Sequence, residues 1–291
     1  MTGKEQKTIL VTGGAGFIGS HLCQALFNQG QRVISLDNYF TGSPNNHISG
    51  VEYIEGNTRD IEKLVKVIPD LVYHLGEYSR VEKSFEDWGI VWESNVVGTF
   101  RVLEFCRKHK VKIVYAGSST KFGDGGLGRD QSPYAWTKAT NTELVCNYGN
   151  WFGLSYAITY FYNVYGPGER SGSFGTLIAI FREKFLSGES LPVVSPGTQR
   201  RNFTHVLDIV DGLIKVGEKG EGDEYGLGAG ESYSVLEVAE MFSGKITMLP
   251  ERRGNRMNGR LDTNRARHEL GWRVTRRLED YVTEIKRGKR T

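Results

Sequence analysis

The chain has 291 residues, of which 38% are hydrophobic, and its formal net charge is +3. This length can form one large α/β domain or a nucleotide-binding domain with a smaller partner. No apolar run reaches the ~20 residues that cross a membrane, and the polar residues 1–7 are not followed by a signal-peptide core. We therefore expect a cytoplasmic protein without membrane contact.

The distribution of charge and cysteine disfavours two further classes. Residues 251–291 hold 13 Lys or Arg and 6 Asp or Glu. Because acidic residues and an LGW turn interrupt this basic run, the run does not predict nucleic-acid binding. We interpret it as solvated surface with one or two arginines directed towards an anionic substrate. Cys23, Cys106 and Cys146 are far apart in helical patterns, which predicts buried thiols and no metal site.

The first predicted element is a buried strand at 9–11 that leads into a glycine-rich turn and a helix. Gly13, Gly16 and Gly19 are spaced GxxGxxG: the first allows a tight turn, the second lets amides approach a pyrophosphate, and the third allows close helix packing. Amides at a helix start, together with the helix dipole, favour phosphate. The turn therefore predicts dinucleotide binding.

The second predicted strand, 32–36, ends in Asp37. An acidic side chain at this position can accept hydrogen bonds from the ribose diol of the adenosine half. Its charge would repel a 2′-phosphate, and no arginine follows it closely to compensate. The sequence therefore favours NAD over NADP as the cofactor.

Strands and helices then alternate, a pattern typical of an α/β fold with a doubly wound parallel sheet of the Rossmann type. Further strands are predicted at 51–56, 70–76, 112–119, 154–164 and 223–227, and helices at 60–68, 92–109, 133–152, 174–186, 205–217 and 234–242. The last helix begins with a capping-box pattern, Ser234 and Glu237. The change in character after residue 165 predicts an NAD-binding domain over 1–165, to which 203–230 return, and a smaller, discontinuous C-terminal substrate domain over 166–202 and 231–291.

Tyr134 and Lys138 are spaced YxxxK at the start of the predicted helix 133–152. Residues i and i+4 share a helix face, so the Lys138 ammonium can favour the phenolate of Tyr134, which could then act as a general base. The spacing alone also fits two surface residues on one helix. The run Ser118-Ser119-Thr120 at the end of the preceding strand favours the catalytic interpretation.

These motifs together resemble the extended short-chain dehydrogenases/reductases, in particular the nucleotide-sugar epimerases and dehydratases. The likeness rests on TGGAGFIG, Asp37-Asn38, the HLG strand end, the Ser118 turn and the Tyr134/Lys138 pair, and continues through NVYGPG at 163–168, RNFTHVLD at 201–208 and LGW at 270–272. It implies NAD as cofactor, Tyr134 as the base, Lys138 on the nicotinamide ribose assisting Tyr134, and Ser118 hydrogen-bonded to the sugar.

The resemblance also implies binding residues and a partner. The cofactor residues it assigns are Gly13, Gly16, Phe17, Ile18, Gly19, Asp37, Asn38, Asn57, Thr58, Leu75, Gly76, Asn95, Tyr134, Lys138 and Tyr162. The diphosphate of a nucleotide-sugar substrate is assigned to Asn163, Arg201 and Arg252, although each arginine could instead be a surface charge. Relatives dimerise through helices that match 92–109 and 133–152, which implies a homodimer.

Several positions depart from the family pattern. Gly76 and Glu77 stand where two small residues are usual, so an acid either lies near the nicotinamide or turns to solvent. Lys121 stands where an apolar residue is usual, Asn255 replaces an acid, and Tyr160 replaces an arginine. Substrate contacts beyond the diphosphate are therefore open.

The turn after the predicted strand 112–119 bears on the reaction. Related dehydratases usually have an Asp-Glu pair there and decarboxylases a Glu, whereas this chain has Ser119 and Thr120, which are neither acids nor bases near neutral pH. We therefore predict an epimerase that acts at C4 of a UDP-hexose, or of its uronate or N-acetyl derivative, through a 4-keto intermediate. Glu77 could in principle substitute as the proton carrier of an elimination. A 4,6-dehydratase, a decarboxylase or a keto-sugar reductase stays an alternative, as does a regulator that binds NAD without turnover.

Overall fold

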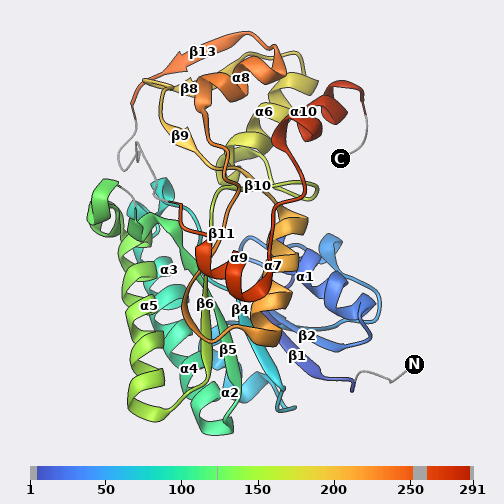
Figure 1. The fold of residues 1–291 in the computed structure, drawn as a ribbon, viewed down its shortest axis with the longest axis vertical. Helices are drawn as coiled ribbons and strands as arrows, with labels where there is room; N and C mark the ends of the chain where they lie inside the picture. The colour runs from blue at the N-terminus through green and yellow to red at the C-terminus, as the bar shows by residue number, and fades with distance from the viewer. Residues whose placement is uncertain (1–4, 123, 252–260, 289–291) are drawn as a thin grey trace.

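A seven-stranded parallel sheet forms the centre of the larger part of the molecule (Figure 1). The computed structural model describes residues 5–122, 124–251 and 261–288. The strand order is β11-β6-β5-β4-β1-β2-β3, and every neighbouring pair is parallel. The strands are β1 (Thr8–Thr12), β2 (Arg32–Asp37), β3 (Glu52–Glu55), β4 (Leu71–His74), β5 (Lys112–Ser118), β6 (Tyr156–Phe161) and β11 (Gly222–Leu227).

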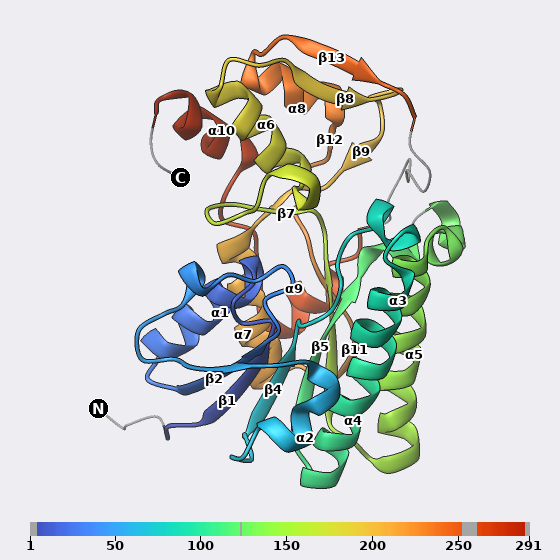
Figure 2. The ribbon, with the colours of Figure 1, turned by 180° about the vertical axis from the view of Figure 1, so that it is seen from behind.

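Helices cover both faces of this sheet (Figure 2). One face carries α1 (Phe17–Asn28), α7 (Val206–Lys219) and α9 (Asn264–Leu270), and the other carries α2 (Ile61–Leu64), α4 (Gly98–His109) and α5 (Pro133–Phe152). Successive strand residues point to opposite faces, so Ile9 and Val11 join the core under α1 and α7, whereas Leu10 joins the core under α4 and α5. Both faces are apolar, as the sequence of a buried parallel sheet requires.

A smaller unit lies beyond the carboxyl ends of the strands and has its own apolar core (Figure 1). It contains α6 (Leu177–Leu186), α8 (Val235–Phe242), α10 (Leu278–Lys286), β8 (Leu191–Val194) and β13 (Ile246–Leu249). Two short strand pairs, β7 (Val164–Tyr165) with β10 (Thr204–His205) and β9 (Arg200–Arg201) with β12 (Tyr233–Ser234), connect it to the sheet. The predicted capping box is present, because the Ser234 side chain accepts from the Glu237 amide and the Glu237 carboxylate accepts from the Ser234 amide.

Short turns complete the described secondary structure. These are the 3-10 segments Pro44–Asn46, Thr58–Asp60, Glu82–Phe85, Ser119–Phe122, Asp124–Asp130 and Gly172–Phe174, together with α3 (Trp88–Val91) and the π-helical segment Trp92–Val97. No helix within the described ranges is long and apolar enough to span a membrane.

The observed elements differ from the predicted ones at several places, and helices α9 and α10 lie beyond the last predicted helix, 234–242. The predicted helix 60–68 ends at Leu64, because the β-branched residues before Pro69 favour extended backbone. The predicted helix 92–109 begins earlier, as α3, and passes through the π-helical segment before α4. Helix α9 and Trp272, assigned from sequence to the smaller domain, pack in the core of the large sheet.

The strand order fixes where a ligand can bind. The chain leaves β1 towards one side of the sheet and returns at β4 on the other side, so a crevice opens between the carboxyl ends of these two strands. The parallel sheet with helices on both faces confirms the predicted Rossmann-type fold. A ligand site is therefore expected at this edge.

Candidate active site

The glycine-rich turn after β1 has the geometry that its sequence predicts. Gly13 has a positive φ of 76°, which favours glycine, and its amide donates to the Leu36 carbonyl at 2.9 Å. A Cβ on Gly19 would lie 2.0 Å from the carbonyl oxygen of Gly13, so no larger residue fits where α1 approaches the turn. Gly16 is the N-cap of α1 and brings no side-chain cap, which leaves the first helical amides for an anion.

Asp37 is the last residue of β2 and lies next to this turn. Its carboxylate accepts from the Ala15 amide at 2.9 Å and from the Tyr39 amide at 2.8 Å, which links the turn to the strand end. Burial raises the pKa of Asp37, and the two amides act in the opposite direction. Beside it, Asn38 Nδ2 donates to Asn57 Oδ1 at 2.9 Å. Each carboxylate oxygen of Asp37 retains a second lone pair with which to accept from a ribose hydroxyl.

A cavity of about 640 Å³ runs from this turn to Tyr134. It is lined by fifteen of the residues proposed from sequence: Gly13, Gly16, Phe17, Ile18, Gly19, Asp37, Asn38, Asn57, Thr58, Leu75, Gly76, Ser118, Tyr134, Lys138 and Asn163. Its volume is typical of cofactor sites. The cradle that Gly13 and Gly19 form, and that a Cβ would fill, fits a dinucleotide pyrophosphate.

The three proposed catalytic residues meet at the far end of this cavity. Ser118 ends β5, whereas Tyr134 and Lys138 lie in the first turns of α5, which begins after the N-cap Ser132. The Ser132 side chain accepts from the Ala135 amide at 3.1 Å and so fixes the start of the helix. Ser118 Oγ accepts from Thr120 Oγ1 at 2.9 Å, so its own hydroxyl proton remains available to a ligand.

Glu77, whose position the sequence left open, is buried behind these residues. Its side chain is 2% exposed and forms an ion pair with Lys138. The carboxylate also accepts from Asn141 Nδ2 at 2.7 Å, Thr99 Oγ1 at 2.8 Å and the Tyr115 hydroxyl at 3.2 Å. Burial alone would raise the pKa of Glu77, but Lys138 and these hydrogen bonds leave it below its ordinary value. Glu77 is therefore a buried carboxylate, turned away from solvent.

Arg80 and Glu169 are among the further charged residues that line the cavity without having been proposed from sequence. Arg80 Nε donates to the Phe174 carbonyl at 2.7 Å, and burial lowers the pKa of its guanidinium. The Glu169 carboxyl is buried with no hydrogen bond of normal length to a described residue. Burial raises the pKa of Glu169 to about 8, although Arg182 and Arg80 oppose this rise. Neither residue stands in a motif whose spacing indicates chemistry.

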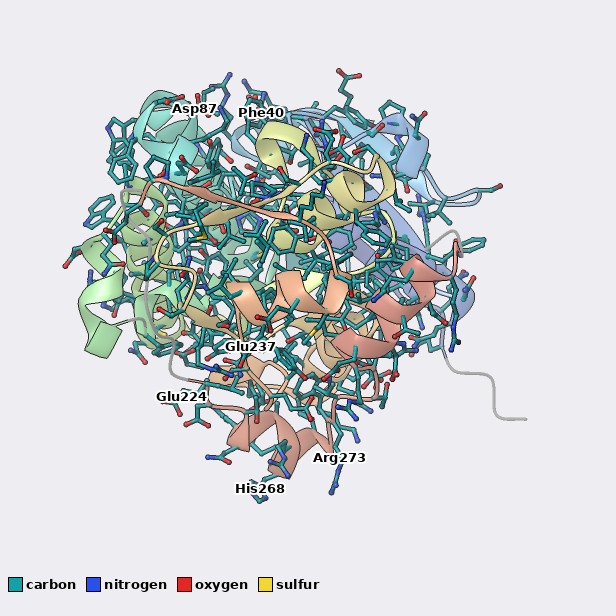
Figure 3. The ribbon with its side chains drawn as sticks, turned by 90° about the horizontal axis from the view of Figure 1, so that it is seen from above. Phe40, Asp87, Glu224, Glu237, His268 and Arg273 are labelled. Atoms are coloured by element: carbon teal, nitrogen blue, oxygen red, sulfur yellow. The ribbon has the colours of Figure 1, made fainter. Side chains whose placement is uncertain are left out.

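The rim of the cavity carries aromatic side chains. The rings of Phe40 and Tyr78 are 5.8 Å apart, and the Tyr78 hydroxyl donates to Asp87 at 2.7 Å. Figure 3 shows Phe40 and Asp87 at one edge of the molecule, with His268 and Arg273 projecting at the opposite edge. The last two are exposed and belong to the basic run, which agrees with its interpretation as solvated surface.

A second cavity, of about 370 Å³, opens between the sheet and the smaller unit. Val81, Thr120 and Asn163 line both cavities, so the two adjoin. Asn163 has a positive φ of 34°, a strained backbone conformation that occurs often at functional sites. Arg201 also lines the second cavity. Arg252, like Asn255, lies outside the described residues.

Other predicted residues lie elsewhere. Asn95 is fully buried, where its Nδ2 donates to Thr137 Oγ1 at 3.1 Å and to the Tyr78 carbonyl at 3.2 Å, so it supports the cavity wall from behind. Tyr162 packs in the core under α4 and α5. Tyr160 donates to Asp223 at 2.6 Å at the far side of the sheet. The thiols of Cys23 and Cys106 are buried, and Cys146 is half-buried.

The chain is similar to known proteins over almost its whole length. The sequence model of the NAD-dependent epimerase/dehydratase family matches residues 9–228. A putative UDP-glucose 4-epimerase of Methanocaldococcus jannaschii is 32% identical over 95% of this chain and 96% of that protein. The UDP-glucuronic acid decarboxylase 1 of Danio rerio is 27% identical over 95% of this chain and 71% of that protein.

A solved structure has the same fold over almost the whole chain. The UDP-glucose 4-epimerase of Thermotoga maritima, solved with UDP-glucose, has a TM-score of 0.90 at 26% identity, with 97% of this chain and 99% of that chain covered. The resemblance found in the sequence is thus confirmed, and so is NAD as the cofactor of the family. The chain belongs to the NAD-dependent epimerase/dehydratase family.

Proposed function

We propose that this protein is an NAD-dependent nucleotide-sugar epimerase that inverts C4 of a UDP-hexose, or of its uronate or N-acetyl derivative. The observation that carries the proposal is that Ser118, Tyr134 and Lys138 line one cavity with the glycine turn and Asp37. A dinucleotide bound to the turn and to Asp37 would extend towards Tyr134. The reacting sugar would then lie between Tyr134 and Ser118.

The mechanism follows from the protonation chemistry of these side chains. NAD, when bound, supplies the acceptor and donor of the C4 hydride. Tyr134 removes the proton from the C4 hydroxyl and later returns it, while Ser118 donates a hydrogen bond to the same oxygen. Lys138 holds the nicotinamide ribose and favours the phenolate of Tyr134. Tyr134 as a whole residue is 9% exposed, so bulk water has little access to the proton that it carries.

Inversion requires the keto sugar to present its other face while the nucleotide stays bound. The second cavity suits this task, because it adjoins the first at Asn163 and contains Arg201. An arginine can hold a diphosphate through two parallel hydrogen bonds. We assign the substrate diphosphate to Asn163, Arg201 and Arg252, and the rotation of the sugar to the space between the two cavities.

The choice of epimerisation over elimination rests on acid–base groups. Ser119 and Thr120 follow β5 where an acid would be needed. Glu77 is already bound to Lys138, Thr99 and Asn141, which counts against it as a carrier of protons to C5 or C6. A reaction that only transfers the C4 hydride and the hydroxyl proton needs neither an acid after β5 nor a proton carrier at Glu77.

Glu169 supports a second candidate, a nucleotide-sugar 4,6-dehydratase. Its carboxyl lines the cavity without a hydrogen-bond partner among the described residues, and burial raises its pKa to about 8, which favours the protonated form at neutral pH. Such a group could carry a proton during elimination of water. An elimination would therefore depend on Glu169, whereas epimerisation would not, and Glu169→Gln separates the two.

We also propose a domain organisation and an assembly for this function. Residues 1–165 with 203–230 bind the dinucleotide, and the smaller unit closes over the nucleotide of the substrate. Large apolar side chains are exposed on α3, α4, α5 and the π-helical segment: Trp88, Trp92, Phe100, Trp151 and Phe152. This face supports a homodimer in which a second copy covers it. Sedimentation at several concentrations tests this, and a monomer mass that does not change with concentration would contradict it.

The experiment that tests the function starts from purified protein. Denaturation should release NAD, and a screen of UDP-, GDP-, CDP- and dTDP-sugars should yield a C4 isomer from a UDP-sugar. Tyr134→Phe should retain NAD and lose turnover by ~10²–10⁴-fold, because the ring stays while the proton acceptor is removed. A Tyr134→Phe variant with more than half of the wild-type activity would remove Tyr134 from the mechanism.

A further inference from the structure

The cations that line the first cavity, which extends from the glycine turn to Tyr134, differ in how their charge is balanced. Those among the described residues are Arg59, Arg80, Lys138 and Arg170. Arg59 pairs with Glu93 at 2.9 Å, and Lys138 pairs with Glu77. Arg170 is exposed, so water can solvate its charge. Arg80 is half-buried and forms no ion pair with any residue that the structure describes, so its charge has no counter-ion there.

Arg80 lies at the catalytic end of this cavity. It belongs to the loop after β4, and the next residue, Val81, lines both cavities. The Arg80 guanidinium also interacts electrostatically with Tyr134. In the proposed mechanism the sugar lies here, between Tyr134 and the diphosphate anchor of the second cavity. The loop that carries Arg80 therefore borders the space assigned to the sugar.

Two hydrogen bonds fix the orientation of the Arg80 guanidinium. Its Nε donates to the carbonyl of Phe174, just before α6, at 2.7 Å, and its Nη1 donates to the Ser79 carbonyl at 3.1 Å. A guanidinium has five N–H groups, so these two bonds leave three for a ligand. A planar fork held in this way suits a carboxylate, whose two oxygens can accept two parallel hydrogen bonds.

The neighbouring acid, Glu169, does not neutralise Arg80. The two side chains interact electrostatically, but neither oxygen of the Glu169 carboxyl accepts a hydrogen bond from Arg80. Burial raises the pKa of Glu169 to about 8, which favours its uncharged form near neutral pH. Burial also lowers the pKa of Arg80, because the cation is poorly solvated. A cation withdrawn from water without an anion costs free energy, and an anionic ligand group would offset that cost.

The chemistry of a nucleotide sugar limits which anion can reach Arg80. The phosphates of cofactor and substrate are assigned to other groups, namely the glycine turn for the dinucleotide and Asn163 with Arg201 for the sugar nucleotide. The ring of a neutral hexose carries no charge. In a hexuronate, C6 is a carboxylate attached to C5, which is the neighbour of the reacting carbon C4. An anion that lies between Tyr134 and Arg80 would therefore be this C6 carboxylate.

We propose that Arg80 is a specificity-determining residue that binds the C6 carboxylate of the sugar, so that the preferred substrate is a UDP-hexuronate and not a neutral UDP-hexose. This rests on the proposed function, which places C4 of the sugar at Tyr134. Two parallel hydrogen bonds from the guanidinium would bind both carboxylate oxygens. A neutral substituent at C6 would leave the cation without a counter-ion, and this difference produces the selectivity.

The test compares the binding of two probes, UDP-glucuronate and UDP-glucose, which differ only at C6. Dissociation constants are measured by calorimetry on Tyr134→Phe loaded with NAD, in which turnover is slow. UDP-glucuronate should bind about 10–100-fold more tightly than UDP-glucose, because its carboxylate forms charge-assisted hydrogen bonds. Arg80→Met in the same background should remove this preference and change the affinity for UDP-glucose by less than about threefold. Arg80→Lys, which keeps the charge but not the planar fork, should retain only part of the preference.

Lys83→Met is the matched control, because it removes one positive charge from the same segment. The Lys83 ammonium lies 5.5 Å from the centre of the Phe174 ring, but Lys83 does not line either cavity as the structure describes them. Its preference should equal that of the parent protein. Equal affinities of the parent for the two probes, or an Arg80→Met variant that weakens both alike, would overturn the inference. The comparison of the two probes stands even if Arg80→Met does not fold.

The reaction of the wild-type protein separates this inference from the proposed function. If UDP-glucuronate binds through Arg80 but loses CO₂, or yields no C4 epimer, the proposed epimerase is contradicted and the role of Arg80 is retained. If UDP-glucose is epimerised and UDP-glucuronate is not preferred, the proposed function holds and the role of Arg80 is refuted.

Discussion

The side chain of Asn141, one turn beyond Lys138 on α5, donates to the carboxylate of Glu77 at 2.7 Å. Glu77 lies in the loop that follows β4. The same Nδ2 group donates to the Asn95 carbonyl at 2.8 Å, and Asn141 is 1% exposed. Asn141→Leu should therefore lower the free energy of unfolding by about 1–3 kcal/mol, because two buried acceptors lose a donor. Chemical denaturation measures this, with Asn150→Leu on the exposed side of α5 as control. A loss no larger than that of the control would show that these bonds contribute little.

The glycine turn gives a prediction of steric origin. Since a Cβ at position 19 would lie 2.0 Å from the Gly13 carbonyl oxygen, Gly19→Ala should displace the turn, lower the free energy of unfolding by about 1–3 kcal/mol and reduce the NAD retained after purification. The matched control is Gly230→Ala, at a glycine whose Cβ would contact nothing within 4 Å. NAD retention and stability equal to those of Gly230→Ala would contradict the close approach.

The carboxylate of Asp37 is predicted to distinguish NAD from NADP. Asp37→Ala removes the charge that would repel a 2′-phosphate, so the preference for NAD, measured as the ratio of the two dissociation constants, should fall by about tenfold or more. Asp37→Asn should have a similar effect while keeping an acceptor for the Ala15 or Tyr39 amide. If both variants reject NADP as strongly as wild type, the Asp37 carboxylate does not determine the preference for NAD.

Glu169 should make stability depend on pH. Because its pKa is raised from 4.5 to about 8, the folded protein keeps a proton that the unfolded chain releases above its ordinary pKa. Its contribution is fully present below pH 4.5 and is lost as the pH rises to about 8, at roughly 1 kcal/mol per pH unit. Denaturant unfolding across this range should show Glu169→Gln gaining stability relative to wild type as the pH rises. The control is Glu183→Gln, because Glu183 has an exposed carboxyl on α6. If the plots of unfolding free energy against pH are parallel for Glu169→Gln and wild type, the pKa of Glu169 is not raised.

The parts of the fold and site that could be predicted from sequence are those with local causes. The turn geometry of Gly13 follows from one residue's freedom at positive φ. Helix α5 begins and ends where predicted, because Ser132 caps its start and Gly153 adopts the left-handed conformation at its end.

The rest depends on contacts between distant segments. Glu77 and Lys138 are 61 residues apart, and nothing in either local sequence indicates that one would neutralise the other. Trp272 was predicted to belong to the smaller domain but packs against the large sheet. Its Nε1 donates at 2.8 Å to the carbonyl of Asp208, which is 64 residues away, and such a contact cannot be recognised from the local sequence. The burial of Glu169, without a hydrogen bond to any residue that the structure describes, is likewise a property of the assembled cavity and cannot be recognised from the spacing of charged residues.

The reaction in D₂O tests the central claim, epimerisation at C4 with direct return of hydride, most directly. The protein is incubated in D₂O with the UDP-sugar identified by the screen, and the product is examined by NMR and mass spectrometry, with Tyr134→Phe as the inactive control. The account predicts a C4 epimer without carbon-bound deuterium, because Tyr134 exchanges only the hydroxyl proton and the hydride never meets solvent. Deuterium at C5 or C6, or release of a 4-keto-6-deoxy sugar, would contradict it and would identify an elimination.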